Sequence, residues 1–260
     1  MRAELERYRR LLSDDEVARE GRLHLDADKE RFVIGRALVR LQLSRLLGGD
    51  PRELPLVTNP YGRPELASSV RTPIGFNVSH ADDLVVCAIT GTLDVGVDVE
   101  RVEPRRTYGL AHRFFAAREV ADLQRRDEAE RARVFFDYWT LKEAYIKARG
   151  LGLALPLDAF AFTLRPPHPP TISFDPSIDD DPDTWQFAQA WPTERHRLAV
   201  AVRRPPGRDL DVLLQLTAAR SPCALLRPDL ELRRPTCAHA AVVEVDLTDR
   251  ALVAGEVDRA

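Results

Sequence analysis

The alternation of apolar and polar positions predicts helices and strands that occur twice along the chain in the same order. Apolar side chains at positions 34, 38 and 41 fall on one side of a helix over residues 28–47, and Gly48 and Gly49 end it. The turn formers of NPYGRP predict a loop after this helix. The stretches FNVSH and LVVCAITG then predict two strands joined by a turn at ADD. The first part of the chain is therefore a helix followed by strands.

The second part of the chain repeats this order. Helices are predicted over residues 107–127 and 128–149, and Gly150 ends the second one. The stretch 165–183 is rich in proline and aspartate and predicts a loop. Strands return at WQFAQAW and HRLAVAVRR, and after RPPG the composition changes to a segment with short strands.

This element order predicts an α+β fold with two halves of similar size. We expect an N-terminal half over residues 1–104 and a C-terminal half over residues 105–204. Residues 205–260 form a C-terminal extension to which the sequence assigns no role.

One predicted strand, LDVGVDVE at 93–100, separates its residues by chemistry. Alternate side chains of a strand point to opposite faces, so valines 95, 97 and 99 share one face. The other face carries Asp94, Gly96, Asp98 and Glu100. This face is either exposed to solvent, as in many sheets, or a site for a hard cation, because acids at i and i+2 can direct oxygens at one ion.

The helix over 128–149 places Trp139, Glu143 and Lys147 above one another on one face, with Lys142 beside them. Two interpretations remain open at this point. Glu143 and Lys147 form a surface salt bridge, or they belong to a reactive site. His80 directly follows Ser79, but neighbouring strand residues point in opposite directions and the chain has no GxSxG turn, which excludes a hydrolase triad built on this pair.

Composition narrows the class of protein. Of 260 residues, 44% are hydrophobic and 30% charged, which is typical of a soluble globular protein. We expect no signal peptide and no membrane span, since the first residues are charged throughout and no apolar run is long enough. Cys87, Cys223 and Cys237 lack CxxC spacing and are expected to be reduced thiols of a cytoplasmic protein.

Charge argues against a nucleic-acid partner, because 38 basic and 41 acidic residues leave a net charge of −3. Arginines cluster locally on the helix over 28–47, at Arg31, Arg36, Arg40 and Arg45. Such clusters are usually solvated helix faces. A small anionic ligand or an acidic protein partner is the alternative.

Several of these features occur together in an order that resembles the 4′-phosphopantetheinyl transferase family of the Sfp type. FNVSH is followed eighteen residues after His80 by Asp98 in GVDVE, and then by WTLKEAYIKARGLGL. GRP at 62–64 is similar to the family's Gly-Lys/Arg-Pro element, and residues 113–115 to its Arg-Phe-Phe segment. The resemblance covers about residues 10–203.

The resemblance implies a fold of two pseudo-two-fold-related α+β halves in one chain, with coenzyme A in the cleft between them. It implies transfer of phosphopantetheine from coenzyme A to a serine of an acyl or peptidyl carrier protein, release of 3′,5′-ADP and a need for Mg²⁺. Because the cleft would be complete in one chain, we expect a monomer without membrane or nucleic-acid partners.

The resemblance also assigns roles to residues. Asp98, Glu100 and Glu143 would hold Mg²⁺, with Asp98 counted among the catalytic residues. Glu143 would be the base for the carrier serine, and Lys147 would stabilise the phosphate or protonate the departing ADP. Contacts to the phosphates of coenzyme A are expected from a larger set, namely Arg31, Arg63, Ser79, His80, Lys142 and Lys147.

Two departures and two alternatives accompany this assignment. Val99 stands where some family members carry a polar or acidic residue, and the residues after 205 have no counterpart. A Mg²⁺-dependent nuclease could also use a D-x-E pair, but it should carry a basic surface. A non-catalytic relative that binds coenzyme or carrier should lack Asp98, Glu143 or Lys147, and all three are present.

Overall fold

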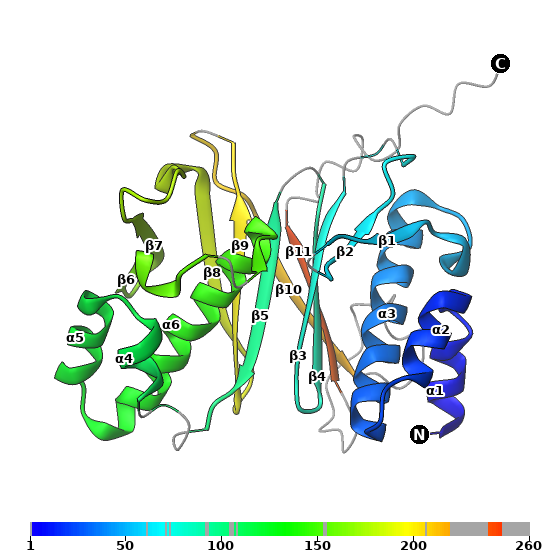
Figure 1. Cartoon of the computed structure of the whole chain (residues 1–260), viewed down its shortest axis with the longest axis horizontal. Helices are drawn as coiled ribbons and strands as arrows, with labels where there is room; N and C mark the ends of the chain where they lie inside the picture. Colours follow the sequence, from blue (N-terminus) through cyan, green and yellow to red (C-terminus); the bar gives the residue numbers. More distant parts are fainter. Residues whose placement is uncertain are drawn as a thin grey trace. The chain divides into compact units, whose positions relative to one another are not determined.

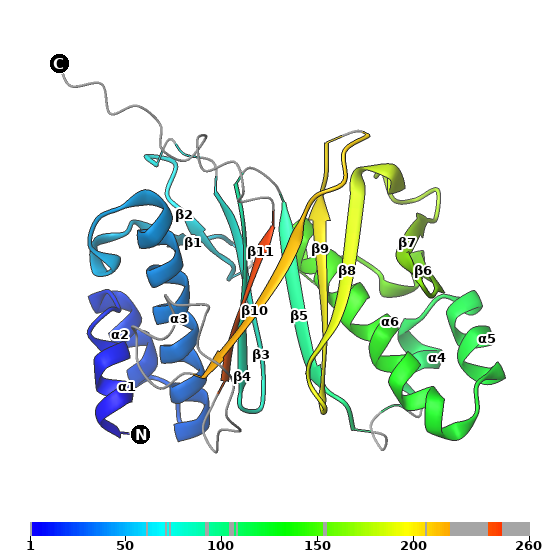
Figure 2. The ribbon, with the colours of Figure 1, turned by 180° about the vertical axis from the view of Figure 1, so that it is seen from behind.

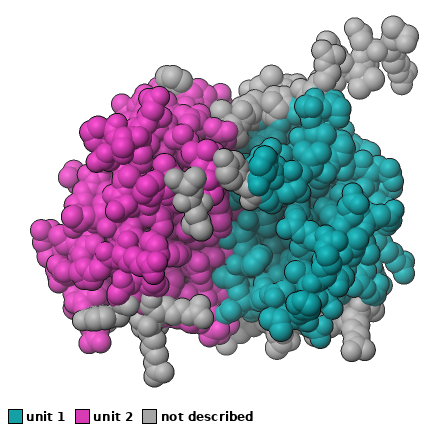
Figure 3. All heavy atoms as spheres, viewed as in Figure 1, with its two compact units in different colours: residues 1–93, 211–260 teal, residues 94–210 magenta. Residues whose placement is uncertain are grey.

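The structure, a computed structural model, divides into two compact units, which Figure 3 shows in different colours. Unit 1 comprises Met1–Leu93 with Asp211–Ala260, and unit 2 comprises Asp94–Leu210. The structure describes residues 2–60, 62–70, 72, 74–91, 94–103, 107, 109–152, 155–205, 207–218 and 239–245.

Unit 1 places a long helix against a sheet (Figures 1 and 2). Its helices are α1 (Arg2–Arg9), α2 (Asp14–Gly21) and α3 (Asp26–Leu47), and a short 3₁₀ turn follows at Pro51–Glu53. Its strands are β1 (Leu56–Thr58), β2 (Pro64–Leu66), β3 (Gly75–Ala81), β4 (Leu84–Thr90), β10 (Val212–Ala218) and β11 (His239–Val245). The main sheet has the order β10-β11-β4-β3, while β1 and β2 form a separate pair.

The predicted helix and strands of this unit are confirmed. α3 ends at Leu47, directly before Gly48, whose φ of 76° favours glycine. Its buried side chains, among them Leu38 and Leu43, join Phe76 and Ile89 of the sheet in one core. Because this face is apolar on both elements, burial from water holds α3 on β3 and β4.

Unit 2 also packs one long helix on a sheet (Figure 1). Its helices are α4 (Leu110–Phe114), α5 (Ala117–Arg125) and α6 (Glu128–Arg149), with 3₁₀ turns at Leu157–Ala159 and Pro182–Thr184. Its strands are β5 (Val95–Arg101), β6 (Phe160–Arg165), β7 (His168–Phe174), β8 (Trp185–Thr193) and β9 (His196–Arg203). The sheet has the order β5-β9-β8, β6 and β7 form a hairpin, and α6 lies against β5 and β9.

Two predictions for unit 2 are corrected. The helix expected over 107–127 is two helices, because the backbone is extended at Phe115, whose ring is buried and stacks on Phe135. The loop expected over 165–183 contains β7, which begins with His168 and two prolines. Prolines cannot donate to a ladder, and β7 pairs only with β6 among the described strands, so an edge position accommodates them.

The compact units divide at positions other than the expected boundaries after residues 104 and 204. β5 belongs to unit 2, because it pairs antiparallel with β9 from Val95↔Val202 to Arg101↔His196. The extension supplies β10 and β11 to the sheet of unit 1, where β11 runs parallel to β4. Residues 206, 219–238 and 246–260 of the expected extension lie outside the described residues.

Two further expectations concern the thiols and membrane spans. Cys87 is a free, buried cysteine, and burial raises the pKa of its thiol to about 12, whereas Cys223 and Cys237 lie outside the described residues. In the part of the chain that the structure describes, no helix combines the length and apolar character needed to cross a membrane.

Candidate functional site

The acidic face of β5 is covered by α6. A Cβ atom at Gly96 would lie 2.0 Å from the carbonyl oxygen of Ala144 and 2.4 Å from the backbone nitrogen of Ala148. Only glycine permits this approach of helix and strand backbones. Asp98, two residues further along the same face, is 3% exposed. The interpretation of this face as solvated is therefore wrong for Gly96 and Asp98, whereas Asp94 at its start is exposed.

Side chains of α6 meet the acids of β5. Lys147 Nζ lies 2.6 Å from Asp98 Oδ1, and the Trp139 indole N–H donates to Glu100 Oε1 at 3.3 Å. Lys147 thus forms an ion pair with a residue of the strand. A salt bridge between Glu143 and Lys147 on the helix surface would not involve the strand. Lys147 and Glu143 are half-buried, so this face of the helix is not a wet surface.

Burial and mutual repulsion disfavour negative charge at this site. Burial, followed by the charge of Asp98, raises the pKa of Glu100 to about 7, although the indole N–H of Trp139 and the charge of Lys147 act in the opposite direction. Burial and Asp98 also raise the pKa of Glu143, again opposed by Lys147. Three acidic side chains therefore interact electrostatically beside one lysine, and an added cation would lower the cost of ionising them.

The donor set fits Mg²⁺ only if the ion also takes ligands from outside the protein. Within the described residues, no group of three or more histidine, cysteine, aspartate or glutamate side chains is arranged to hold a metal ion by itself. Mg²⁺ usually binds one or two carboxylates and completes its shell with water and phosphate oxygens. Asp98 and Glu100, two apart on β5, supply that smaller set, while Val99 between them is buried.

Lys142, one of the expected phosphate contacts, is buried and bound by protein groups. The residue is 0% exposed, and its ammonium lies 2.8 Å from Glu119 Oε2. It also donates to the carbonyls of Leu157 and Phe160, each at 2.7 Å. These three partners match the three donors of an ammonium group. Lys142 therefore ties α5 and α6 to the 3₁₀ turn before β6 and to the first residue of β6.

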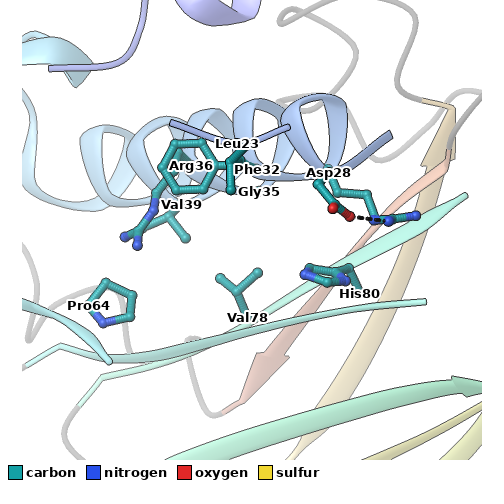
Figure 4. Close-up of a pocket in the computed structure, with 10 residues that line it drawn as sticks. Leu23, Asp28, Phe32, Gly35, Arg36, Val39, Pro64, Val78 and His80 are labelled. Atoms are coloured by element: carbon teal, nitrogen blue, oxygen red, sulfur yellow. Dashed lines mark hydrogen bonds and ion pairs between the residues drawn. The ribbon is translucent and has the colours of Figure 1, made fainter. Parts of the chain in front are cut away.

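Unit 1 contains a pocket of about 350 Å³ between α3 and β3 (Figure 4). Two of the expected coenzyme contacts, Arg31 and His80, line it together with Pro64 of the GRP element. His80 is exposed, and Arg31 is held by Asp28 at 2.5 Å and by the carbonyl of Asp82 at 3.3 Å. The pocket therefore combines an apolar lining with cationic or polar side chains at its edge.

Arg63 and Ser79 are sequence neighbours of residues that line this pocket, but they do not line it themselves. The Arg63 N–H donates to Asn59 Oδ1 at 3.0 Å, and its guanidinium donates to the carbonyl of Phe76 at 3.2 Å. Ser79 is buried on β3 and lies between the lining residues Val78 and His80. The structure thus brings Arg31 and His80 together, while Arg63 connects the loop after β1 to β3.

Arg36 lines the same pocket and was not among the expected contacts. Its guanidinium stands over the Phe32 ring at 5.4 Å, and its Nε lies 3.9 Å from Glu16. Arg40 binds the same glutamate more closely, at 2.6 Å. Figure 4 shows Arg36 reaching from the helix and His80 from the strand. Burial lowers the pKa of Arg36, the charge of Glu16 opposes this, and nearby arginines lower the pKa further, so an anion in the pocket would favour the charged guanidinium.

The solvated-face interpretation of the arginine cluster is therefore wrong for Arg36 and Arg40. Arg40 is 1% exposed and donates to the carbonyls of Pro51, Arg52 and Leu54. The helical spacing of Phe32 and Arg36 indicates that both side chains lie on one face of the helix. The spacing alone does not show which part of the chain lies opposite that face.

Models of known protein families match both units of the chain. Residues 94–201 match the model described as "4'-phosphopantetheinyl transferase superfamily", and residues 1–92 match "4'-phosphopantetheinyl transferase, N-terminal". The boundary between these two matches agrees with the division of the compact units before Asp94.

Individual proteins give the same family. 4'-Phosphopantetheinyl transferase HetI of Nostoc sp. is 33% identical over 74% of this chain and 78% of its own length. 4'-Phosphopantetheinyl transferase Sfp of Bacillus subtilis is 33% identical over 62% of this chain and 70% of its own. A solved structure, holo-[acyl-carrier-protein] synthase of Thermotoga maritima, covers 48% of this chain and 70% of its own with 22% identity and a TM-score of 0.35. On the sequence matches, this chain belongs to the 4′-phosphopantetheinyl transferase superfamily.

Proposed function

We propose that this chain transfers the 4′-phosphopantetheine group from coenzyme A to a serine hydroxyl of an acyl or peptidyl carrier domain. The observation that carries the proposal is the pairing of β5 and α6, which gathers Asp98, Glu100 and Lys147 in a member of this superfamily. The second product is 3′,5′-ADP.

The pocket of unit 1 supports a binding role for the nucleotide end of the coenzyme. Arg31, Arg36 and His80 offer donors to phosphate, while Phe32 and Val39 supply apolar surface. Arg63 is proposed to act from the neighbouring loop, and Ser79 from β3. The expected pseudo-two-fold relation of the halves and a coenzyme site in a cleft between them remain part of this proposal.

Mg²⁺ is proposed as the cation, with Asp98 and Glu100 as ligands and Glu143 as a third. Bound there, it would neutralise charge on the diphosphate of the coenzyme. Support comes from the carboxylates themselves, because burial and repulsion raise the pKa values of Glu100 and Glu143. A divalent ion would remove that penalty.

Glu143 is the proposed base. Its carboxylate would accept the proton of the carrier serine while the serine oxygen forms a bond to phosphorus and the bond to the ADP oxygen breaks. The charge of Lys147 and a bound cation would favour the ionised carboxylate, which is the form that accepts a proton. Lys147, held towards the acids of β5 by Asp98, would stabilise charge on the phosphate or protonate the leaving 3′,5′-ADP.

Mass spectrometry of the carrier tests the function. The full chain is mixed with coenzyme A, Mg²⁺ and the apo form of an acyl or a peptidyl carrier domain. We expect the carrier to gain the mass of one phosphopantetheine group, and the gain to disappear with Asp98→Ala or with excess EDTA. Coenzyme binding without any mass gain on either carrier would instead indicate a non-catalytic relative.

A further inference from the structure

The indole of Trp139 makes a polar contact that none of the proposed catalytic roles uses. Its N–H, which can only donate, lies 3.3 Å from Glu100 Oε1. The contact crosses from α6 to β5, so it joins the element that carries Glu143 to the strand that carries the proposed metal ligands. A tryptophan placed only for packing would not require this contact with a carboxylate.

Aromatic neighbours fix the direction of the indole. The Phe135 ring stacks on Trp139 with centroids 5.8 Å apart and planes 18° apart. Phe114 meets the indole edge-to-face at 6.0 Å and 78°, and Phe115 lies 6.3 Å away. Such arrangements are the preferred geometries of aromatic pairs. The Arg-Phe-Phe segment at 113–115 therefore contributes to holding the tryptophan that contacts Glu100.

The contact leaves Glu100 able to bind a cation. A carboxylate has two oxygens with several acceptor positions, and the indole uses one of them. Trp139 thereby orients one oxygen and leaves the other available to a metal ion.

We propose that Trp139 is a positioning residue that aims Glu100 at a divalent cation shared with Asp98. The phenylalanines of the Arg-Phe-Phe segment act on Glu100 through this indole. The inference rests on the proposed function, because it takes Glu100 as a metal ligand.

Binding of Mn²⁺, followed by electron paramagnetic resonance with coenzyme A present, tests the proposal on the full chain. Trp139→Phe keeps a ring for the stack and removes the N–H. Its dissociation constant for Mn²⁺ should rise about tenfold or more, as is usual when the partner of a metal ligand is lost. Trp185→Phe is the matched control, because the Trp185 indole donates to Asp180 at 3.0 Å in the same unit. It should leave Mn²⁺ affinity unchanged.

A double-mutant cycle separates a direct effect from a general loss of structure. In a Glu100→Ala background, Trp139→Phe should cause no further loss of Mn²⁺ affinity. If Trp139→Phe does not fold, Phe114→Leu keeps the indole and should still weaken Mn²⁺ binding by a smaller factor.

The proposal is wrong if Trp139→Phe binds Mn²⁺ as tightly as the wild type, or if the loss is equally large without Glu100. Wild-type protein that modifies the carrier but binds no Mn²⁺ would overturn the metal assignment and this inference with it, while the transfer function would stand.

Discussion

Each unit places a 22-residue helix, α3 or α6, against its sheet, and each helix buries one cation fourteen residues after its first residue. In unit 1 this is Arg40, bound to Glu16 and to backbone carbonyls just beyond the helix. In unit 2 it is Lys142, bound to Glu119 and again to later carbonyls. Both glutamates are the third residue of the preceding helix and accept the N–H of its N-cap. The same arrangement, a buried cation bound by a glutamate and by later backbone carbonyls, thus supports both helices.

The units differ where helix and strand approach each other. In unit 1 the glycine is on the helix, and a Cβ at Gly35 would lie 3.5 Å from Val78, an ordinary contact. Gly35 lines the pocket. In unit 2 the glycine is on the strand, and at Gly96 the two backbones leave no room for a side chain. Helix α3 therefore leaves space for a ligand, while α6 brings polar side chains to the acids of β5. This difference fits the proposed division, in which unit 1 binds the coenzyme and unit 2 carries the reactive groups.

Glu143→Gln should separate these two roles most strongly. It retains the shape and one oxygen but loses the proton acceptor, so kcat should fall by about 10²–10⁴. Coenzyme affinity, measured by calorimetry, should change little if binding resides mainly in unit 1. A variant with normal turnover would remove Glu143 from the reaction, and recovery at high Mg²⁺ would limit its role to metal binding.

Lys142→Met tests whether the buried cation is structural in unit 2, as Arg40 is in unit 1. Removing the lysine leaves Glu119 buried without its charge partner, and the free energy of unfolding should fall by about 3–5 kcal/mol. The double variant Lys142→Met with Glu119→Gln should recover part of this loss in urea unfolding. Normal stability combined with weakened coenzyme binding would restore the phosphate-contact role.

Gly96→Ala and Gly35→Ala form a matched pair of variants that tests how closely helix and strand approach in each unit. Gly96→Ala forces a methyl group into the backbone of α6 and should cost about 1–3 kcal/mol or more of unfolding free energy. Gly35→Ala meets only ordinary contacts and gains helix propensity, so stability should rise by up to about 1 kcal/mol. Equal effects in urea unfolding would contradict the difference in helix approach between the units.

Arg36→Ala and His80→Ala should show the opposite pattern to Glu143→Gln. Each removes a donor to a charged group, and coenzyme affinity should weaken by about 1.5–3 kcal/mol per variant. Arg45→Ala, outside the pocket lining on the same helix, is the control and should bind normally. Unchanged calorimetric affinity in both pocket variants would show that the coenzyme is bound elsewhere.

A smaller effect is expected on the pH dependence of stability, because unit 2 buries acidic side chains. The pKa of Glu100 rises from its ordinary value of 4.5 to about 7 in the folded chain. Between these values the folded chain keeps a proton that the unfolded chain releases, so stability without metal should fall as pH rises from about 4.5 to about 7. Thermal unfolding in EDTA checks this, and Mg²⁺ should raise Tm more at the upper end. Glu100→Gln should flatten the profile.

The sequence by itself determined the elements and the identity of the chemical groups. Helical spacing predicted α3 and α6, and the alternation in residues 93–100 assigned Asp98 and Glu100 to one face of β5. Motif order indicated the family that the comparisons confirm. These properties depend on local periodicity and on short spacings, which are visible in a linear chain.

Only the tertiary structure decided what covers each face. Periodicity shows that Gly96 and Asp98 share a side of the strand, but not that a helix packs there instead of water. Lys142 and Glu143 are neighbours in sequence, yet Lys142 is buried because Glu119 and the carbonyls of Leu157 and Phe160 come from distant segments. The same holds for β11, which joins β4 across more than half of the chain. Burial, ion pairing and strand order depend on contacts between remote residues, and no local pattern encodes which of these segments will meet.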